Sequence, residues 1–537
     1  MSQSRSPKAV SLEIFRHLFT ALCEEMGATL KRASFSPNIK ERRDYSCALF
    51  DSSGAAVSLG DHMPVHLGAM PMSVEAALAE IGKLAPGDVV CLNDPFSGGT
   101  HLPDITLISA VHEERGKLLG YVASRAHHSD VGGSTPGSMP LAREIFEEGI
   151  RIPPVRLYEA GQLNTSLWKT LLANVRTPVE RAGDLDAQVA ALHTGSKRLC
   201  EIAQRRGTEE TLTAMEQLIE YADRLVEVAL NIVPDGCYQA EDWIEDDGFG
   251  SGPIPIRVSL NIEGSRLTVD FEGTSPQVPG GVNAVAAITS SATRYVVRCI
   301  VEALLGEPLS AGGGSMSAVE LILPESSVVN ADFPASVAAG NVETSQRITD
   351  VLLQAFGFAL PDHIPAMSQG TMNNTSVGGI DPRNGEVFAY YETVGGGMGA
   401  GPTGPGLSGV HCHMSNSLNT PVEALEHAYP YRVTHYGIRR NSGGSGMYQG
   451  GDGLRRDLML LVPARVTLLC ERRTSGPPGT QGGKAGAPGE NVLICDGVER
   501  YLPGKTNFTI QAGDIISIRS PGGGGWGAIP EESRHES

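Results

Sequence analysis

A histidine and two aspartates lie close together in a glycine-bearing loop of this sequence. The stretch NDPFSGGTHLPDITLISAV, residues 93–111, places Asp94, His101 and Asp104 just before an apolar, strand-like segment. Pro103 disfavours a continuing helix between His101 and Asp104 and favours an extended or turn geometry. In such a turn both side chains can face one ion, so His101 and Asp104 are candidate metal ligands.

Two further histidines follow at the end of the next strand-like segment, LLGYVASRAHH. They are His127 and His128. Because adjacent residues of a strand face opposite sides, only one of the two is expected to join a shared site. We expect His127 to be the ligand and His128 to contact substrate or support the site, although the pattern leaves the choice between them open.

Two histidines with one or two aspartates form a ligand set of nitrogen and oxygen atoms without thiolate. Such a set suits Mn²⁺, Fe²⁺ or Zn²⁺ with open coordination positions. An ion of this kind polarises a carbonyl or generates a hydroxide. The alternative is structural, since histidine and aspartate near glycine often only bond the backbone of a turn.

Several other polar clusters are weaker candidates. Glu41 and Asp44 lie three residues apart in NIKERRDYSCALFD, where the neighbouring lysine and arginines are typical of a solvated charge cluster. Two further clusters contain histidine and are possible ligand sets. One is Asp61, His62 and His66 in DHMPVHLGAM, and the other is His411 and His413 in HCHMSN.

Signatures of a serine nucleophile or a nucleotide-binding loop are absent from the sequence. There is no GxSxG elbow, and Cys412 between two histidines does not by itself indicate a Cys–His hydrolase. None of the glycine-dense stretches has the pattern GxxxxGK[ST], and none is a strand-linked GxGxxG with a partner acid. The sequence therefore offers no nucleotide-binding loop of these types.

Charge and cysteine content exclude some classes of protein. Lys and Arg number 42 against 61 Asp and Glu, a net charge of −19, which argues against a nucleic-acid partner and an anionic membrane surface. The nine cysteines form no CxxC pair, as expected for reduced thiols. Without a signal-peptide core or a run of 18 apolar residues, the sequence predicts a soluble cytoplasmic protein.

The candidate ligands must be positioned by a set of short strands. Apolar residues spaced by four predict a helix over residues 11–34. The segments SCALFD, AVSLG, DVVCLNDP, ITLISAV and LLGYVASRAHH then alternate with Gly, Pro and Asp. This pattern predicts a mixed sheet that carries function on its loops.

The rest of the chain divides into a helical and a glycine-dense part. Residues 184–233 predict two long helices, and residues 256–275 predict a hairpin with its turn at 263–265. We predict an α+β fold with mixed sheets, long flanking helices and a β-rich C-terminal part. The expected divisions are an N-terminal metal-site domain (1–183), a helical hairpin (184–235) and a glycine-dense domain (236–537).

Nine motifs, in order over about residues 10–527, resemble the hydantoinase B/oxoprolinase family. They are SPNIKERRDYSCALFD, MPVHLGAM, NDPFSGGTHLPDITL, SRAHHSDVGG, GNVETSQR, QGTMNN, YYETVGGGMGA, HMSNSLNTPVEALE and PGGGGWG. The resemblance implies the B component of an ATP-dependent hydrolase of hydantoins, 5-oxoproline or lactams. It also implies a hydantoinase A/oxoprolinase-type ATPase component that phosphorylates the amide oxygen, so that ATP and Mg²⁺ belong to the partner.

The resemblance also carries specific residues. It implies a metal site on Asp44, His101, Asp104 and a histidine of RAHH, with one divalent transition metal (Mn, Zn or Fe). Glu41 or His128 would then manage protons during hydrolysis. We expect a homodimer within a hetero-oligomer. The alternatives are a component of a ketone carboxylase and a non-catalytic scaffold for the ATPase component.

Overall fold

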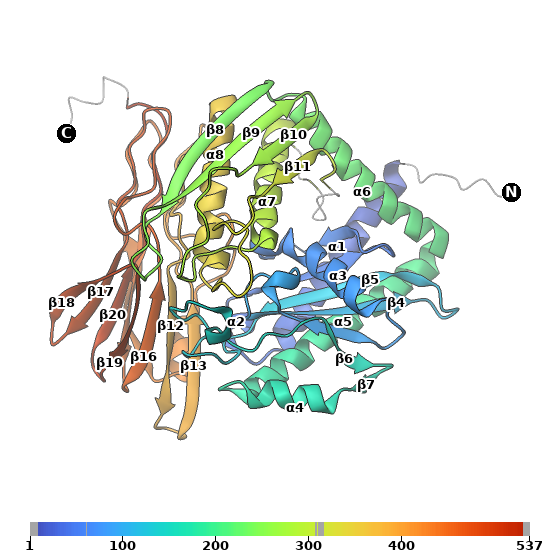
Figure 1. The fold of residues 1–537 in the computed structure, drawn as a ribbon, viewed down its shortest axis with the longest axis horizontal. Helices are drawn as coiled ribbons and strands as arrows, with labels where there is room; N and C mark the ends of the chain where they lie inside the picture. The colour runs from blue at the N-terminus through green and yellow to red at the C-terminus, as the bar shows by residue number, and fades with distance from the viewer. Residues whose placement is uncertain (1–8, 61, 307–308, 310–315, 530–537) are drawn as a thin grey trace.

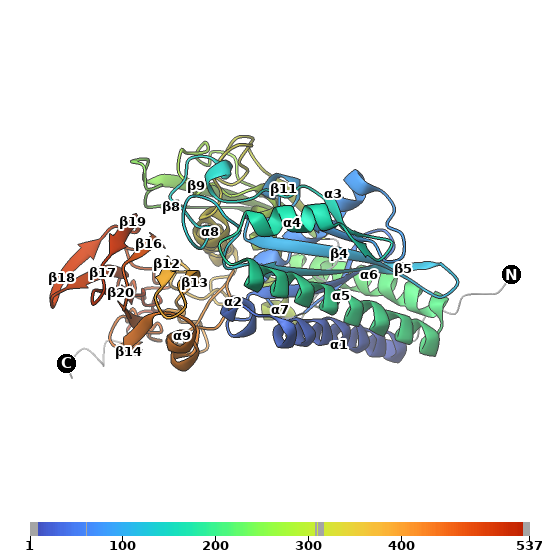
Figure 2. The ribbon, with the colours of Figure 1, turned by 90° about the horizontal axis from the view of Figure 1, so that it is seen from below.

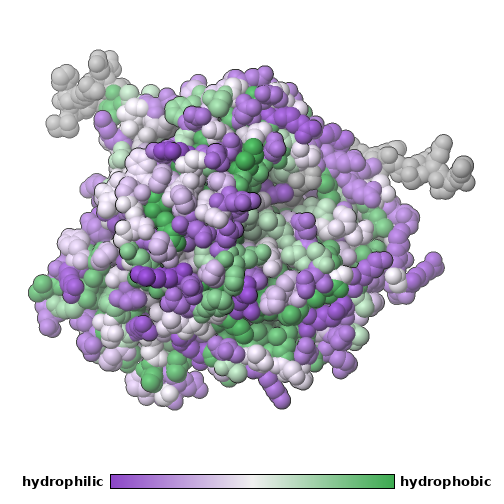
Figure 3. Space-filling model, viewed as in Figure 1, coloured by the Kyte–Doolittle hydropathy of each residue, from purple (hydrophilic) through white to green (hydrophobic). Residues whose placement is uncertain are grey.

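A computed structural model describes residues 9–60, 62–306, 309 and 316–529. It confirms an α+β fold, in which helices flank several sheets (Figures 1 and 2). Within these residues, no helix combines the length and the apolarity that crossing a bilayer requires. On the face drawn in Figure 3, hydrophilic side chains surround smaller hydrophobic areas.

The N-terminal sheet has seven strands in the order β2-β1-β5-β4-β3-β6-β7. We expected mixed pairing here, but all pairs of this sheet are antiparallel. The physical reason is that neighbouring strands such as β4 and β5 are joined by a direct hairpin, which makes them antiparallel. The strands are β1 (Tyr45–Phe50), β2 (Ala56–Leu59), β3 (Val89–Leu92), β4 (Asp104–His112), β5 (Leu118–His127), β6 (Val155–Glu159) and β7 (Gln162–Leu163).

Helices cover both faces of this sheet. Figure 2 shows α1 (Ala9–Ala33), α5 (Pro178–Arg206) and α6 (Thr208–Leu230) side by side on one face. The helix α3 (Ala69–Ile81) contacts the other face. Every residue of β1 and β3 is therefore buried, as expected for strands covered on two sides.

The predicted N-terminal helix and helical hairpin are confirmed. The proposed division between residues 183 and 184 falls inside α5, which packs along β4 and β5. The three-part division of the chain stays a prediction. Short helices complete this region: α2 (Pro37–Lys40), α4 (Thr165–Ala173), η1 (Pro64–His66), η2 (Pro95–Ser97) and η3 (Ile145–Glu147).

A second sheet follows in the order β11-β10-β9-β8. The predicted hairpin is confirmed, with its turn between β9 and β10, and the pairing of β10 with β11 is parallel, so this sheet is mixed. Helix α8 packs against β8 and β9 and against α7. The elements are β8 (Gly236–Ile244), β9 (Ile254–Glu263), β10 (Arg266–Asp270), β11 (Val319–Ile322), α7 (Ala286–Leu305), the π-helix η4 (Gly340–Thr344) and α8 (Ser345–Ala359).

The C-terminal part is β-rich, as predicted, with sheets in the orders β13-β12-β16-β19 and β14-β15-β20-β17-β18. Its elements are β12 (Asn374–Asp381), β13 (Glu386–Glu392), α9 (Val422–Ala428), β14 (Tyr431–Arg439), β15 (Gly453–Leu460), β16 (Ala464–Leu469), β17 (Glu490–Cys495), β18 (Val498–Leu502), β19 (Lys505–Ile510) and β20 (Ile515–Arg519).

The glycine-dense stretches of this part pack against one another through their backbones around residues 521–527. The amides of Gly522 and Gly525, which are three residues apart, donate to the carbonyls of Ala487 and Lys484 in one neighbouring segment. The amides of Gly523 and Trp526 donate to a second segment, at Gly451 and Tyr448. This period of three is that of a polyproline II helix, which has no internal hydrogen bonds and so leaves its amides for neighbours.

Candidate metal centre

His101, Asp104 and His127 converge at one end of the N-terminal sheet. Asp104 begins β4 and His127 ends β5, and the two residues are direct partners in the antiparallel ladder. His101 reaches them from the preceding loop. Its Nε2 lies 3.1 Å from His127 Nδ1, and each of these nitrogens lies 3.3 Å from Asp104 Oδ1.

The size of this triangle fits a bound divalent ion. Three ligand atoms around a zinc- or manganese-like ion, at distances of about 2.0–2.1 Å, are separated by about 3.0–3.4 Å. All three residues are buried, and Asp104 Oδ1 has no hydrogen-bond partner. A buried carboxylate oxygen that faces two imidazole nitrogens at this spacing is well suited to a cation.

Hydrogen bonds hold the other atoms of these side chains. His101 Nδ1 donates to the carbonyl of Ala338 (3.3 Å), which leaves Nε2 of the neutral ring as the nitrogen available to an ion. Asp104 Oδ2 accepts from Thr100 Oγ1 (2.5 Å) and His66 Nε2 (3.3 Å). Oδ2 is therefore committed to the protein, and Oδ1 is available for an ion.

Burial and charge determine the protonation of the cluster. Burial alone would raise the pKa of Asp104, but the charge of His101 and hydrogen bonds from the surrounding imidazoles hold that pKa well below its usual value. Burial lowers the pKa of His127, whereas Asp104 overcomes burial at His101 and raises its pKa. The cluster thus offers an ionised carboxylate and, at His127, a neutral imidazole, whereas a metal ion would have to displace the proton that Asp104 favours on His101.

Asp44 lies at the edge of the cluster, beside a cavity of about 10 Å³. This inner cavity is lined by Asp44, Met63, Val65, His66, Asp104, His127, Asn341, Val342, Met372, Tyr391, Thr393, Ser415 and Ser417. Its volume is about that of one water-sized body. The Asp44 carboxylate lies 3.8 Å from the Arg42 guanidinium.

His128 and Glu41 lie apart from the cluster. His128 faces the opposite side of β5, where its Nε2 lies 2.9 Å from Gln188 Oε1 of α5. Burial lowers the pKa of His128 to about 4. Glu41 is a half-buried C-cap residue of α2, and neither it nor His128 lines the inner cavity. Their predicted proton-transfer roles stay predictions.

The weaker histidine candidates have separate surroundings, except for His66. His411 contacts Ser415 (3.0 Å), and His413 contacts Tyr295 (3.4 Å). His62 packs on the ring of Tyr45, and Asp61 lies outside the described residues. In the part of the chain that the structure describes, His101, Asp104 and His127 are the group of three that can hold an ion.

Asn341 and Tyr391 contact the cluster without having been assigned to it from the sequence. Asn341 Nδ2 donates to His101 Nε2 (3.0 Å), and the Tyr391 ring stacks on His127 at 4.5 Å. Both lie more than 200 residues along the chain from these histidines. The sequence motifs GNVETSQR and YYETVGGG mark these two residues as candidates for a role in function. A motif does not predict which distant residue its side chains contact in the folded protein.

The fold and the cluster define an α+β protein with a buried His–Asp–His group suited to a divalent ion. The sequence profile of hydantoinase B/oxoprolinase matches residues 8–529, and the chain belongs to this family.

Three relatives illustrate the family. The chain is 39% identical to 5-oxoprolinase 1 of Arabidopsis thaliana, over 97% of this chain but 42% of the relative. It is 29% identical to a protein named as the B component of a D-/L-hydantoinase of Pseudomonas sp. (strain NS671), over 94% and 87% of the two chains. The crystal structure of an ATP-dependent caprolactamase from Pseudomonas jessenii superposes with a TM-score of 0.89 at 28% identity, covering 98% and 93%.

The chain thus spans about two fifths of the length of the plant oxoprolinase and most of the two bacterial relatives.

Proposed function

We propose that this chain is the metal-dependent B component of an ATP-dependent cyclic-amide hydrolase. The observation that carries the proposal is the triangle of His101, Asp104 and His127, whose edges of 3.1–3.3 Å match the ligand spacing around a divalent ion. The relatives named for oxoproline, hydantoin and caprolactam act on cyclic amides, which supports a substrate of that class.

ATP is assigned to a partner in this proposal. The sequence contains no nucleotide-binding loop of the known types, and one relative is named as one component of a hydantoinase with several. An amide is a poor electrophile because its nitrogen lone pair is delocalised. Phosphorylation of the amide oxygen by an ATPase component with Mg²⁺ would remove that resonance before hydrolysis.

Within this chain, the cluster would hold the ion and order the reacting groups. A bound divalent ion would supply Lewis-acid polarisation and an activated water. His101, held by Ala338, and Asp104, held by Thr100 and His66, would keep the ligand atoms in place. Asp44, which lines the inner cavity, would be the further ligand that the family resemblance implies, and Glu41 or His128 would carry protons.

Two other functions are separable by experiment. A carboxylase component would require bicarbonate and would not open a ring. A scaffold for the ATPase component would retain no ion and would lose nothing when a ligand residue is replaced. The cluster favours the hydrolase over the scaffold because a buried carboxylate oxygen that faces two imidazole nitrogens at 3.3 Å is an arrangement suited to holding a cation.

The first prediction concerns His101→Ala in the protein co-expressed with its ATPase component. We expect ion content, measured by elemental analysis, to fall from about one per chain to about a tenth or less, because one of three ligands is lost. Ring opening of hydantoin, 5-oxoproline or caprolactam should fall in parallel. The matched control is His193→Ala, since His193 is exposed on α5. Equal ion content in both variants would contradict the proposal.

A further inference from the structure

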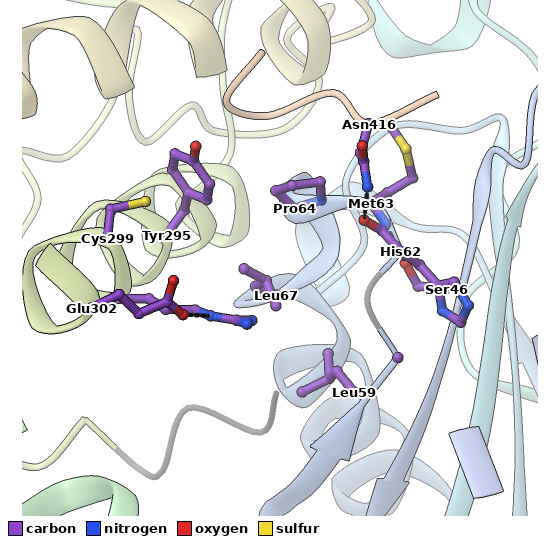
Figure 4. A pocket seen from close by; sticks show the side chains of 12 residues that line it. Ser46, Leu59, His62, Met63, Pro64, Leu67, Tyr295, Cys299, Glu302 and Asn416 are labelled. Atoms are coloured by element: carbon purple, nitrogen blue, oxygen red, sulfur yellow. Dashed lines mark hydrogen bonds and ion pairs between the residues drawn. The ribbon is translucent and has the colours of Figure 1, made fainter. Parts of the chain in front are cut away.

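A second, larger cavity opens beside the inner cavity. This outer pocket, of about 280 Å³, lies between residues 59–60, 62–64 and 67 on one side and helix α7 on the other. Figure 4 shows Tyr295, Cys299 and Glu302 of α7 facing Pro64 and Leu67 across it, with Asn416 close to Met63 on the far side. Its residues come from three distant parts of the chain, so it forms only in the folded protein.

Met63 belongs to both cavities. Its side chain lines the outer pocket and also the inner cavity that contains Asp104 and His127. The segment 415–417, on the other side of the outer pocket, also contacts both cavities. Asn416 lines the outer pocket, whereas its neighbours Ser415 and Ser417 line the inner cavity. Met63 and the backbone of residues 415–417 therefore form part of the wall between the two cavities.

A chain of hydrogen bonds crosses this wall. Ser46, which lines the outer pocket, contacts His66 Nδ1 through its Oγ at 2.8 Å. The opposite nitrogen of the same ring, Nε2, donates to Asp104 Oδ2. A polar group bound beside Ser46 is thus two side chains away from the candidate metal ligand.

Exposure falls steadily along the same direction. Asn416 is exposed, and Pro64, Leu67 and Tyr295 are half-buried. Met63 is only 6% exposed, and His66 is 1% exposed. Methionine is unbranched and changes rotamer readily, so Met63 is the side chain whose movement would join the two cavities.

The chemistry of the outer pocket suits a small ring with a polar edge. Leu59, Met63, Pro64 and Leu67 supply apolar surface, and Ser46 and Asn416 supply hydrogen-bonding groups. Arg298 is paired with Glu302 at 3.0 Å, so these two charges largely offset each other. A volume near 300 Å³ is at the lower end for small-molecule sites and accommodates a ring of about five to seven members.

We propose that the outer pocket is the vestibule that binds the ring of a small cyclic amide, and that Met63 separates it from the metal centre. This inference rests on the proposed function. It assigns Leu67, Pro64 and Met63 as residues that select ring size, and it makes the outer pocket the route by which small molecules reach the ion.

The test fills the outer pocket with Leu67→Trp and, at its exposed rim, with Asn416→Trp. Three readouts are ion content, the rate at which dipicolinate removes the ion, and binding of 2-pyrrolidinone followed by ligand-observed NMR. We expect unchanged ion content, removal at least about tenfold slower, and weaker lactam binding in both variants. The matched control is Val179→Trp, which adds the same side chain to a separate cavity lined by Phe35 and Phe388.

The outcomes separate the two proposals. If the wild-type protein holds its ion but the outer-pocket variants match Val179→Trp in ion removal and lactam binding, the vestibule is wrong and the metal-dependent function stands. If the wild-type protein holds no ion, the proposed function fails and the vestibule fails with it. Asn416→Trp keeps the test valid if Leu67→Trp does not fold.

Discussion

At the residue scale, the adjacent histidines His127 and His128, at the end of β5 and just after it, have different environments. His127 faces Asp104, and its ring stacks on Tyr391. His128 faces α5 and contacts Gln188, whose side-chain amide also donates to the carbonyls of Ile105 and Ser124. This contact ties α5 to the sheet, so His128 is expected to contribute to stability whether or not it also carries protons.

The second prediction compares His127→Asn with His128→Asn. We expect His127→Asn to lose the ion because a ligand is removed. His128→Asn should keep the ion and lose about 1 kcal/mol of stability, since it shortens a buried hydrogen-bonding side chain. Elemental analysis and thermal unfolding measure the two effects. Loss of the ion in His128→Asn but not in His127→Asn would reverse the assignment.

Glu343 is a buried acid that the proposed function does not use. Its Oε1 accepts hydrogen bonds from the Met372 amide (2.9 Å) and from Asn374 Nδ2 (2.7 Å), while Oε2 has no partner. Burial raises the pKa of Glu343 to about 7. Because the folded pKa lies above the unfolded value of 4.5, the stability from this group is full below about pH 4.5 and is lost as pH rises through about 7.

The third prediction follows from this loss of stability as pH rises. In Glu343→Gln, a neutral side chain replaces the acid, so this pH-dependent loss should disappear. Relative to the variant, the wild-type protein should lose on the order of 3 kcal/mol between pH 4.5 and pH 8. Melting temperatures measured at several pH values in that window test this. Parallel pH profiles for the two proteins would show that Glu343 does not titrate in this range.

At the element scale, the glycine-dense segments act as tightly packed extended chains. A Cβ placed on Gly450 would lie 2.0 Å from the carbonyl oxygen of Gly523, which is closer than any real contact. The lack of a side chain at such positions allows the backbones to approach and to exchange hydrogen bonds. Packing, in addition to conformational freedom, therefore accounts for the abundance of glycine in this part.

The fourth prediction is that Gly450→Ala destabilises the C-terminal part strongly. The added methyl must displace backbone, which costs about 3 kcal/mol or more. Gly404→Ala is the matched control, because nothing lies within 4 Å of a Cβ at that position. Soluble yield and melting temperature measure the difference. Similar melting temperatures for the two variants would show that the segments can separate to admit a side chain.

At the scale of the whole molecule, Arg42 joins the N-terminal part to the C-terminal part beside the candidate site. Its guanidinium is fully buried. It donates to the carbonyl of Tyr391 (3.2 Å), to Thr393 Oγ1 (2.6 Å) and to Ser417 Oγ (3.3 Å). Tyr391 in turn stacks on His127. The metal centre therefore depends on docking between segments some 350 residues apart.

The fifth prediction concerns Arg42→Lys, which keeps the charge but loses the planar fork of donors. We expect the melting temperature to fall by about 3–6 °C and ion affinity to weaken by about tenfold, because Tyr391 is no longer held against His127. The control is Arg465→Lys, an exposed arginine that donates to Ser134. An unchanged ion affinity in Arg42→Lys would show that the position of His127 does not depend on Arg42.

Local pattern was sufficient for much of this molecule. The spacing of apolar residues predicted α1, α5 and α6, and alternating residues predicted the hairpin of β9 and β10, because these features depend on near neighbours in the chain. The opposite orientation of His127 and His128 also followed from the two-residue period of a strand. Nine motifs, taken in order along nearly the whole chain, identified the family.

Tertiary structure decided what the pattern left open. The antiparallel order of the first sheet, the approach of Asn341 and Tyr391 to the histidines, and the outer pocket behind Met63 all join residues far apart in sequence. No local rule ranks such contacts, because their free energy comes from burial and hydrogen bonding that exist only once the layers have packed.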